Sequence, residues 1–567
     1  MTTGIDALLT SLDAARSRFS RGAITRTARL LDRLSSCDFD DAKLLLRFHE
    51  TLLFLRAFPQ SQTLVAQVEK ILNVFHERVE KLRGSGADMA VFDEFDTSGV
   101  AGTVMQDTLN FDAARWLARR IPRSVEIVWE DYKEERAMGS TWPRFIPLLA
   151  EDADVEANIP WRHWLDAARG HERDFAWLIR QVEQLPVTVC EGSELYDSLR
   201  LPLRWRLENL KLSRTRNWTR PRQFYFHTEP LITRSQVSLA RELAKPTPAL
   251  VKLSSREGER VMDAIREVML VRYRELYGTT LGDPRSVVRA TLGRGVVMYF
   301  WNLPVERRLP LRAYVAGFTL KNGVPINYIE AIGLCEWIEV GFNTFYTYRQ
   351  GETAWIYAQA LRCLCELTGA TTISVYPYQI GQNNDEALDS GAFWFYRKLG
   401  FRSGRSDLEQ LARREEAKIA ADPQYRTPKK TLKRLAEAHV FYELKQRSSS
   451  GSWDTFSTRN LGLLVNRRMA REFGGDATRI RASSVKEVSG ALGVNWSRWS
   501  PAGRQAFENW AVALALVSDL RRWSAEEKRG VVKMIRAQAG ANEMRYLRLT
   551  QRQSRLREEL LRLGSKA

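Results

Sequence analysis

Four strand-like runs in close succession, followed by an unusually apolar helix, constrain the fold of this chain more than any other feature. β-Branched and aromatic residues dominate four runs, namely 296–303, 313–320, 324–333 and 336–345. The tripeptide Lys-Asn-Gly at 321–323 is typical of a hairpin turn. Residues 351–369 are apolar around most of a helical circumference, which indicates burial on nearly all sides. We therefore expect a meander of antiparallel strands packed against a buried helix.

Further strands and helices surround this unit. The run 249–253 predicts a brief strand, and a capping box of Ser254 and Glu257 begins an amphipathic helix whose apolar stripe ends at Gly278. After the buried helix, the pattern predicts a strand at 371–378 and a short aromatic helix at 390–401. It then predicts two helices in a charged insertion at 402–438 and a closing strand at 439–447. Residues 236–447 thus belong to the α/β (α+β) class, as a central domain with a mixed sheet.

The flanking parts of the chain have helical patterns. Apolar residues recur every three or four positions through 44–58 and 64–82, and Pro59 between them predicts a helical hairpin. Single hydrophobic cores rarely grow beyond roughly 250 to 300 residues, so a chain of 567 residues is expected to form about three domains. We expect a mainly helical N-terminal region of unassigned role at 1–235. We also expect a linker at 448–452, followed by a basic helical C-terminal region at 453–567.

The chain is strongly basic. Its net charge is +18, and residues 451–567, with 22 basic against 11 acidic side chains, hold +11 of it. Such a charge favours an acidic partner, and the C-terminal region is where nucleic acid would most readily bind. A second stretch, 200–226, alternates Arg or Lys with Trp, Leu and Phe. That pattern is typical either of single-strand binding or of Arg and Trp side chains packed between domains.

Composition also argues against several classes of protein. No apolar run approaches the ~20 residues of a membrane span, and Asp6 and Asp13 interrupt the apolar residues near the start, so neither a span nor a signal peptide is expected. The five cysteines show no metal-ligand spacing, so we expect no metal site, and their sparse use fits a reducing cytoplasm.

Two short stretches carry a resemblance to a known family. The aromatic helix and the turn after it contain a spaced set of residues, Asp389, Ala392, Tyr396, Arg397, Lys398, Leu399, Gly400 and Phe401. The turn before the buried helix reads Arg349, Gln350, Gly351, Glu352, Thr353 and Ala354. With the order of strands and helices over about residues 248–447, these stretches resemble the GNAT superfamily of acyl-CoA-dependent N-acyltransferases.

The resemblance implies a site for acyl-CoA as co-substrate. In this family, backbone NH groups at the start of the helix after the fourth strand hold the CoA pyrophosphate, which the partial positive charge of a helix N-terminus makes favourable. The residues of this chain that match that turn are those at 349–354, with Glu352 standing where the family usually has glycine. The resemblance further implies that Tyr396 protonates the departing thiolate.

A base near the acyl carbonyl is the other group that the resemblance implies, because an amine attacks a thioester only when it is unprotonated. Family members often take this base from the fourth strand or its neighbour, which makes Glu339 and Glu330 the candidates, with Glu336 third. Three polar residues at the edge of the expected cleft either bind the acceptor amine or cap the next helix, namely Gln379, Asn383 and Asn384.

Two functions are therefore carried forward. The leading hypothesis is an N-acyltransferase that moves an acyl group from a thioester to an amine, with acyl-CoA, an acyl carrier protein or an aminoacyl-tRNA as donor. The alternative is a catalytically inactive GNAT-like protein that acts as a nucleic-acid-binding or scaffold protein, as the basic C-terminal region allows. The acyl group and the acceptor are not specified by the sequence.

Overall fold

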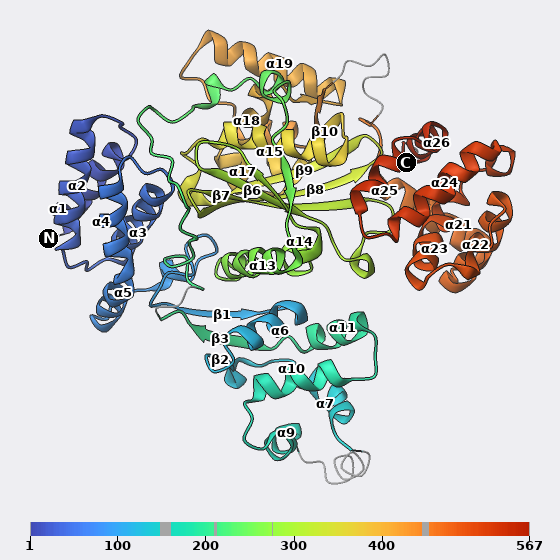
Figure 1. The fold of residues 1–567 in the computed structure, drawn as a ribbon, viewed down its shortest axis with the longest axis horizontal. Coiled ribbons are helices and arrows are strands. Elements are labelled where there is room, and N and C mark those ends of the chain that lie inside the picture. Colours follow the sequence, from blue (N-terminus) through green and yellow to red (C-terminus); the bar gives the residue numbers. More distant parts are fainter. Residues whose placement is uncertain (1, 148–159, 209–211, 275, 445–452, 566–567) are drawn as a thin grey trace.

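The computed structural model describes residues 2–147, 160–208, 212–274, 276–444 and 453–565. N-terminal and C-terminal helices lie at opposite ends of the molecule, with a large sheet between them (Figure 1). The N-terminal bundle contains α1 (Thr2–Ala15), α2 (Arg21–Ser35), α3 (Ala42–Ala57), α4 (Gln62–Asn73) and α5 (Phe75–Gly84). The predicted hairpin around Pro59 is formed by α3 and α4, which pack on each other.

A smaller body with its own hydrophobic core lies beside the sheet (Figure 1). It combines an antiparallel three-stranded sheet of order β1-β3-β2 with helices. Its elements are β1 (Val104–Thr108), α6 (Phe111–Arg120), β2 (Val125–Ile127), α7 (Glu135–Thr141), α9 (Trp161–Arg169), α10 (Asp174–Gln184), α11 (Val189–Leu199) and β3 (Pro202–Arg206). The sequence pattern predicts helices here and misses the strands, which are too short to show a clear alternation.

Several aromatic and basic residues of 200–226 are used for packing, whereas Arg206, Arg220 and Arg222 are exposed. Trp205 is buried in the smaller core, at 1% exposure. The indole of Trp218 donates a 2.9 Å hydrogen bond to the carbonyl of Asn322 in the central domain, and the guanidinium of Arg56 lies 5.1 Å from its ring centre. Of the two interpretations of this stretch, the structure supports packing between parts of the chain.

The central domain is built on a nine-stranded sheet of order β11-β12-β10-β9-β8-β7-β6-β5-β4. Strands β6 to β9 form the predicted antiparallel meander, which β5, a strand that was not predicted, and β4 extend. Strand β10 runs parallel to β9, and β12 is antiparallel to β10. The strands are β4 (Leu250–Lys252), β5 (Val288–Thr291), β6 (Val296–Trp301), β7 (Ala313–Lys321), β8 (Val324–Leu334), β9 (Trp337–Thr344), β10 (Thr372–Val375), β11 (Arg402–Ser403) and β12 (Val440–Glu443). The mixed sheet predicted for this region is thus present.

Helices cover both faces of this sheet. On one face, Gly278 of α14 lies against Tyr314 and Ala316 of β7; on the other, Tyr357 of the buried helix packs on Phe342 of β9, with ring centres 4.8 Å apart. The helices of this domain are α12 (Leu239–Leu243), α13 (Ser255–Leu270), α14 (Tyr277–Thr280), α15 (Thr353–Thr368), α16 (Pro377–Ile380), α17 (Asp385–Asp389), α18 (Ala392–Lys398), α19 (Ser406–Ala421) and α20 (Lys429–Leu435). Both helices predicted for the charged insertion are present, as α19 and α20.

Local sequence signals set several of these boundaries. The capping box of Ser254 and Glu257 starts α13, and Gly369, at φ +74°, ends α15 in the left-handed conformation. The apolar stripe expected to continue to Gly278 stops earlier, because α13 ends at Leu270 and Tyr273 beyond it has φ +51°. A separate short helix, α14, carries the chain onward. The closing strand is shorter than predicted, and residues 445–452, including the predicted linker, lie outside the described ranges.

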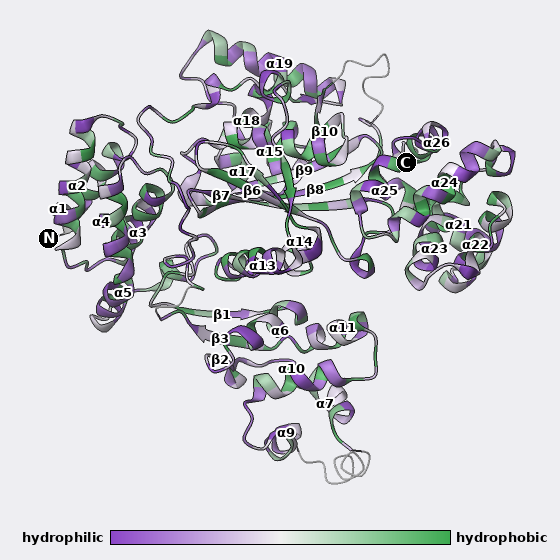
Figure 2. Cartoon of the chain, viewed as in Figure 1, coloured by the Kyte–Doolittle hydropathy of each residue, from purple (hydrophilic) through white to green (hydrophobic). Residues whose placement is uncertain are grey.

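The C-terminal helices join the same core as the sheet and the N-terminal bundle. They are α21 (Thr458–Phe473), α22 (Ala477–Leu492), α23 (Pro501–Leu514), α24 (Ala525–Gln538), α25 (Glu543–Thr550) and α26 (Ser554–Gly564). Helix α25 packs on β7 and β8, where Gly333 leaves room for Leu547. Figure 2 shows hydrophobic strands at the centre and mixed colouring along the outer helices, as expected for amphipathic helices around a buried sheet.

Candidate functional site

The turn that the resemblance assigns to a pyrophosphate is filled by the protein itself. A Cβ atom on Gly351 would lie 2.4 Å from the ring of Phe58, which follows α3 of the N-terminal bundle. The side-chain oxygen of Gln350 accepts a 2.9 Å hydrogen bond from the guanidinium of Arg16 in the same bundle. Arg349 forms an ion pair with Glu386. The close approach that glycine permits at 351 therefore serves a packed aromatic ring.

Glu352 occupies the N-cap position of α15 and is fully buried among cations. Its carboxylate pairs with the guanidinium of Arg294, lies 3.1 Å from the buried ammonium of Lys321 and accepts a 3.2 Å hydrogen bond from the backbone NH of Ile232. Burial alone would raise the pKa of Glu352, but the two cations outweigh it and hold the pKa below its usual value. A negative charge is thus already bound at this helix N-terminus.

Tyr396 lies inside the protein. Its ring packs edge-on against Tyr357 and Phe401, with centre distances of 5.6 and 5.7 Å, and the residue is 4% exposed. Burial raises the pKa of its hydroxyl, which makes it a weaker proton donor. The assignment of Tyr396 as a general acid requires an accessible hydroxyl and therefore disagrees with this placement, because the ring fills the space between α15, α18 and the sheet.

The candidate bases have different surroundings. Glu336 is bound by Arg557, at 2.5 Å, and by the indole of Trp453, at 2.9 Å, so it ties the sheet to the C-terminal region. Glu330 lies on the face of the sheet covered by α14 and accepts a hydrogen bond from the hydroxyl of Tyr314. Burial raises the pKa of Glu330, against the opposing effect of that hydrogen bond. Glu336 also lines a cavity of about 380 Å³, where the guanidinium of Arg557 neutralises its charge.

Glu339, in contrast, marks the point where two strands separate. Strand β10 pairs with Trp337, Ile338 and Glu339, while β9 continues alongside β8 to Thr344. At this fork, Nε2 of His439 lies 2.8 Å from a carboxylate oxygen of Glu339. The ring of Tyr376, half exposed, contacts the imidazole edge-on at 5.3 Å. A carboxylate and an imidazole in contact can accept and release a proton, so the fork has the chemistry of a base.

The polar residues predicted at the cleft edge divide between two roles. Gln379 lies close to β9, since a Cβ atom placed on Gly341 would be 3.6 Å from the side-chain nitrogen of Gln379. The side-chain oxygen of Asn384 accepts a 3.1 Å hydrogen bond from the NH of Ala387 and so caps α17, and Asn383 precedes it with φ +54°. Asn384 therefore acts as a cap, whereas Gln379 faces the fork.

Two adjoining cavities form a second candidate site, between the sheet edge and the C-terminal helices. Their volumes are about 890 and 850 Å³, and both are lined by Lys533, Ala541, Asn542 and Arg545. Because these residues line both cavities, the cavities are neighbours, and we call the pair the basic groove. Its first cavity also borders β4 through Lys252, and its second reaches α22 through Leu492.

Exposed cations line the basic groove without carboxylate partners. On α24, Arg529, Lys533 and Arg536 follow each other at intervals of four and three residues, and therefore project from one face of the helix. Arg545 of α25 and Arg552 just beyond it add to the same space. Within the described ranges, none of these five side chains forms an ion pair, and no carboxylate lines the second cavity. Two carboxylates, Asp283 and Glu366, line the first cavity, but neither forms an ion pair with these five cations within the described ranges. The groove is thus a concave surface with an excess of positive charge.

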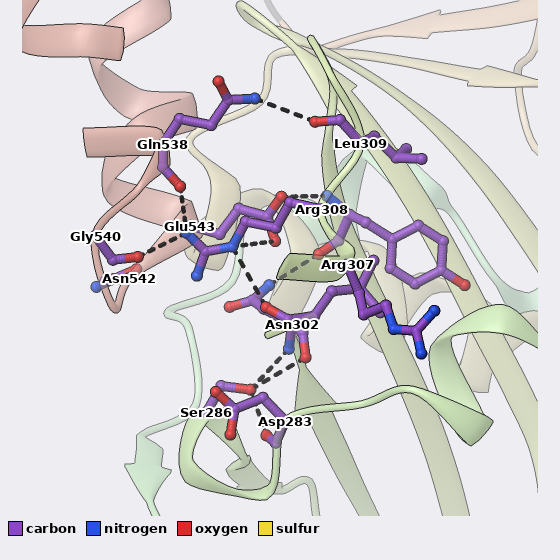
Figure 3. Close-up of polar contacts among 12 residues, drawn as sticks. Asp283, Ser286, Asn302, Arg307, Arg308, Leu309, Gln538, Gly540, Asn542 and Glu543 are labelled. Carbon is purple, nitrogen blue, oxygen red and sulfur yellow. Dashed lines mark hydrogen bonds and ion pairs between the residues drawn. The ribbon is translucent and has the colours of Figure 1, made fainter. Parts of the chain in front are cut away.

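Arg308 lines the first cavity of the basic groove, and Figure 3 shows its polar contacts. Its guanidinium donates hydrogen bonds to the carbonyls of Gln538, Gly540 and Leu303, the second at 2.6 Å and the third at 3.3 Å. The carboxylate of Glu543 lies 3.7 Å away and is fully buried. Burial raises the pKa of Glu543 to about 7, despite the opposing effect of Arg308. The turn between α24 and α25 is therefore held rigidly against the sheet.

Neighbouring polar groups continue these contacts along β6 (Figure 3). The side-chain nitrogen of Asn302 donates to the carbonyl of Tyr314 at 2.9 Å, and its backbone NH donates to the hydroxyl of Ser286 at 2.9 Å. Asp283 is engaged by Arg285, at 2.9 Å. These groups bond to one another and therefore have a structural role. The exposed cations around them are the groups available to a ligand.

Comparison with protein-family models, with curated proteins and with solved structures finds no match for this chain. Its chemistry is therefore argued from geometry. The described residues contain no group of three or more His, Cys, Asp or Glu side chains that could hold a metal ion. Within the same ranges, no helix combines the length and the apolar composition that crossing a bilayer requires.

Sequence reasoning located the basic region but not the residues of the groove. The spacing of Arg529, Lys533 and Arg536 is visible in the sequence and could have predicted a basic helix face. His439, in contrast, is an isolated histidine before a short strand, 100 positions after Glu339. Nothing in the sequence around it signals the pairing, which arises because β12 lies beside β10.

Replacing Glu352 by Gln tests the buried charge cluster. The variant keeps the side-chain shape but leaves Arg294 and Lys321 without their anion, which we expect to lower the free energy of unfolding by about 3 to 5 kcal/mol. Chemical denaturation measures the change. The matched control is Glu386→Gln, which removes an exposed ion pair and should cost no more than about 1 kcal/mol. Equal effects in both variants would contradict the assigned role of Glu352.

Glu543 predicts a pH dependence of stability. Since its pKa is raised in the folded protein from 4.5 to about 7, the folded state keeps a proton that the unfolded state has lost between these values. Stability from this group is therefore present at low pH and is lost as the pH rises from about 4.5 to about 7, by an amount on the order of 3 kcal/mol. The measurement is the unfolding free energy of wild type and Glu543→Gln from pH 5 to 8.

The unfolding free energy of Glu543→Gln should increase relative to that of the wild type as the pH rises, because the Gln side chain has no charge to bury. Glu526→Gln, at an exposed position in the first turn of α24, serves as the control and should run parallel to the wild type. Parallel curves for Glu543→Gln as well would show that its carboxyl does not titrate as the structure implies.

Proposed function

We propose that the chain is a nucleic-acid-binding protein whose central domain supports the basic groove. The observation that carries the proposal is the groove itself, a concave surface lined by Arg529, Lys533, Arg536, Arg545 and Arg552 without carboxylate partners among the described residues. Phosphate groups are the anions that such side chains bind most readily, and each bound phosphate releases counterions. The net charge of +18 favours approach of the same ligand.

The state of α15 supports the same proposal. In a CoA-dependent enzyme of the resembled family, the N-terminus of this helix would be open to a diphosphate. Here Phe58 and Glu352 occupy that position, so the site implied for the cofactor is not open. The five exposed cations of the groove, in contrast, form no ion pair within the described ranges. Anion binding is therefore supported at the groove and not at the helix.

A salt titration with labelled oligonucleotides tests the proposal. Because binding releases counterions, the logarithm of the association constant should fall linearly with the logarithm of salt concentration between about 50 and 200 mM. Neutralising Arg529, Lys533 and Arg545 together by Gln should weaken binding at least about tenfold and reduce the slope by about 3. Fluorescence anisotropy measures both quantities.

The matched control neutralises three exposed cations outside the groove, Lys43, Lys70 and Arg123. This triple variant has the same net charge as the groove variant, so a purely global effect of charge would weaken binding equally in both. That result, or no binding of any oligonucleotide at about 50 mM salt, would contradict the proposal.

A second candidate function, acyl transfer, is supported by the fork between β9 and β10. There Glu339 and His439 can take the proton of an amine as its nitrogen attacks an acyl carbon. The donor would have to be held elsewhere than at α15, whose N-terminus is occupied. An acyl carrier protein or an aminoacyl-tRNA meets this requirement, because each carries its acyl group on an extended arm. With the first donor the carbon–sulfur bond breaks and a thiolate leaves, and with the second the carbon–oxygen bond of an ester breaks and the ribose oxygen leaves with a proton.

For this second function, His439→Ala is the informative variant. We expect it to lower kcat/KM of any detected acyl transfer by about 10² to 10⁴, the usual contribution of a general base. His163→Ala, at an exposed site in α9, is the control. A panel of acyl thioesters and amines supplies the assay. Loss of activity in Tyr396→Phe with none in His439→Ala would instead favour the assignment implied by the family resemblance.

A further inference from the structure

We infer that the ligand of the basic groove is a single strand of nucleic acid, bound through both its phosphates and its bases. This inference rests on the proposed function and specifies its ligand. Three observations support it: the size of the cavities, the apolar residues between the cations, and the placement of Arg536.

The size of the cavities suits bases that are turned out of a strand. Their volumes, about 890 and 850 Å³, lie in the range of pockets that hold small ligands. A single strand can turn its bases into such cavities, whereas the bases of a duplex are paired and stacked inside the helix.

Apolar side chains between the cations provide surfaces for bases. Leu492, Val494, Val532 and Ala537 line the second cavity together with the cations of α24. A ligand made of phosphate alone, such as polyphosphate, gains nothing from these residues. A nucleotide presents an anionic phosphate and a flat, weakly polar base, and so uses both kinds of surface.

Arg536 combines the two kinds of contact. Its guanidinium lies 4.5 Å from the ring centre of Trp499, and the residue also lines the second cavity. Stacking on the indole orients the guanidinium plane, and the opposite face of such a plane is a surface on which bases stack in single-strand complexes. Stacking of this kind tolerates every base, so we expect little dependence on sequence.

Competition binding tests the inference. The probes are a labelled single strand of about 20 nucleotides, as DNA and as RNA, with the duplex of the same sequence and inorganic polyphosphate as competitors. We expect at least one single strand to bind about tenfold more tightly than its duplex, and polyphosphate to compete poorly at equal phosphate concentration. Duplex binding as tight as single-strand binding, or equal competition by polyphosphate, would overturn the inference while leaving the proposed function intact. No binding of any nucleic acid would remove both.

Val532→Thr separates base contacts from charge. The substitution preserves shape and charge but places a hydroxyl where a base would pack, so single-strand affinity should fall about threefold, with polyphosphate affinity unchanged. Val187→Thr, at an exposed valine between α10 and α11, is the matched control and should change neither. Melting temperatures of both variants verify folding. An equal loss of affinity for both ligands in Val532→Thr, or none for either, would contradict the role assigned to the apolar residues.

Discussion

The buried guanidinium of Arg308 is a central contact between the C-terminal helices and the central sheet, together with the pairing of Arg557 and Glu336. It bonds to its own loop through the carbonyl of Leu303 and to the α24–α25 turn through the carbonyl of Gly540, and it lies 3.7 Å from the carboxylate of Glu543. Gln538 adds hydrogen bonds to the carbonyls of Leu309 and Pro310. Because that turn positions Lys533 and Arg545, the shape of the basic groove follows from these contacts.

Positive charge is handled in opposite ways at the two ends of the central domain. Near the start of α15, Glu352 neutralises Arg294 and Lys321 in a buried cluster. In the groove, the cations of α24 and α25 remain exposed to solvent and unpaired within the described ranges. A buried cation without a partner is costly, whereas an exposed one is hydrated and free to exchange its counterions for phosphates. Glu352, Arg294 and Lys321 therefore form a structural cluster, whereas the exposed cations of the groove form a surface that is available to an anion.

Features that depend on neighbouring residues could be predicted from the sequence, and those that depend on distant contacts could not. The capping box of Ser254, the turn before β8 and the Gly369 terminus of α15 were all foreseen. The strands of the smaller body were missed, and Tyr396 was assigned an accessible hydroxyl although packing on Tyr357 buries it. Likewise, Glu352 finds its NH donor at Ile232, 120 positions away. Sequence patterns record which face of an element is apolar, but not which element will cover it.

The two buried ion clusters differ in when they can form as the chain emerges from the ribosome. Three groups that bind the carboxylate of Glu352, namely Ile232, Arg294 and Lys321, precede it in the chain and are translated before it. Arg308, however, meets Gly540 and Glu543 only after more than 230 further residues have been added. Since domains begin to fold during synthesis, the central sheet must stay soluble with that guanidinium still hydrated until residues 540–543 have been translated.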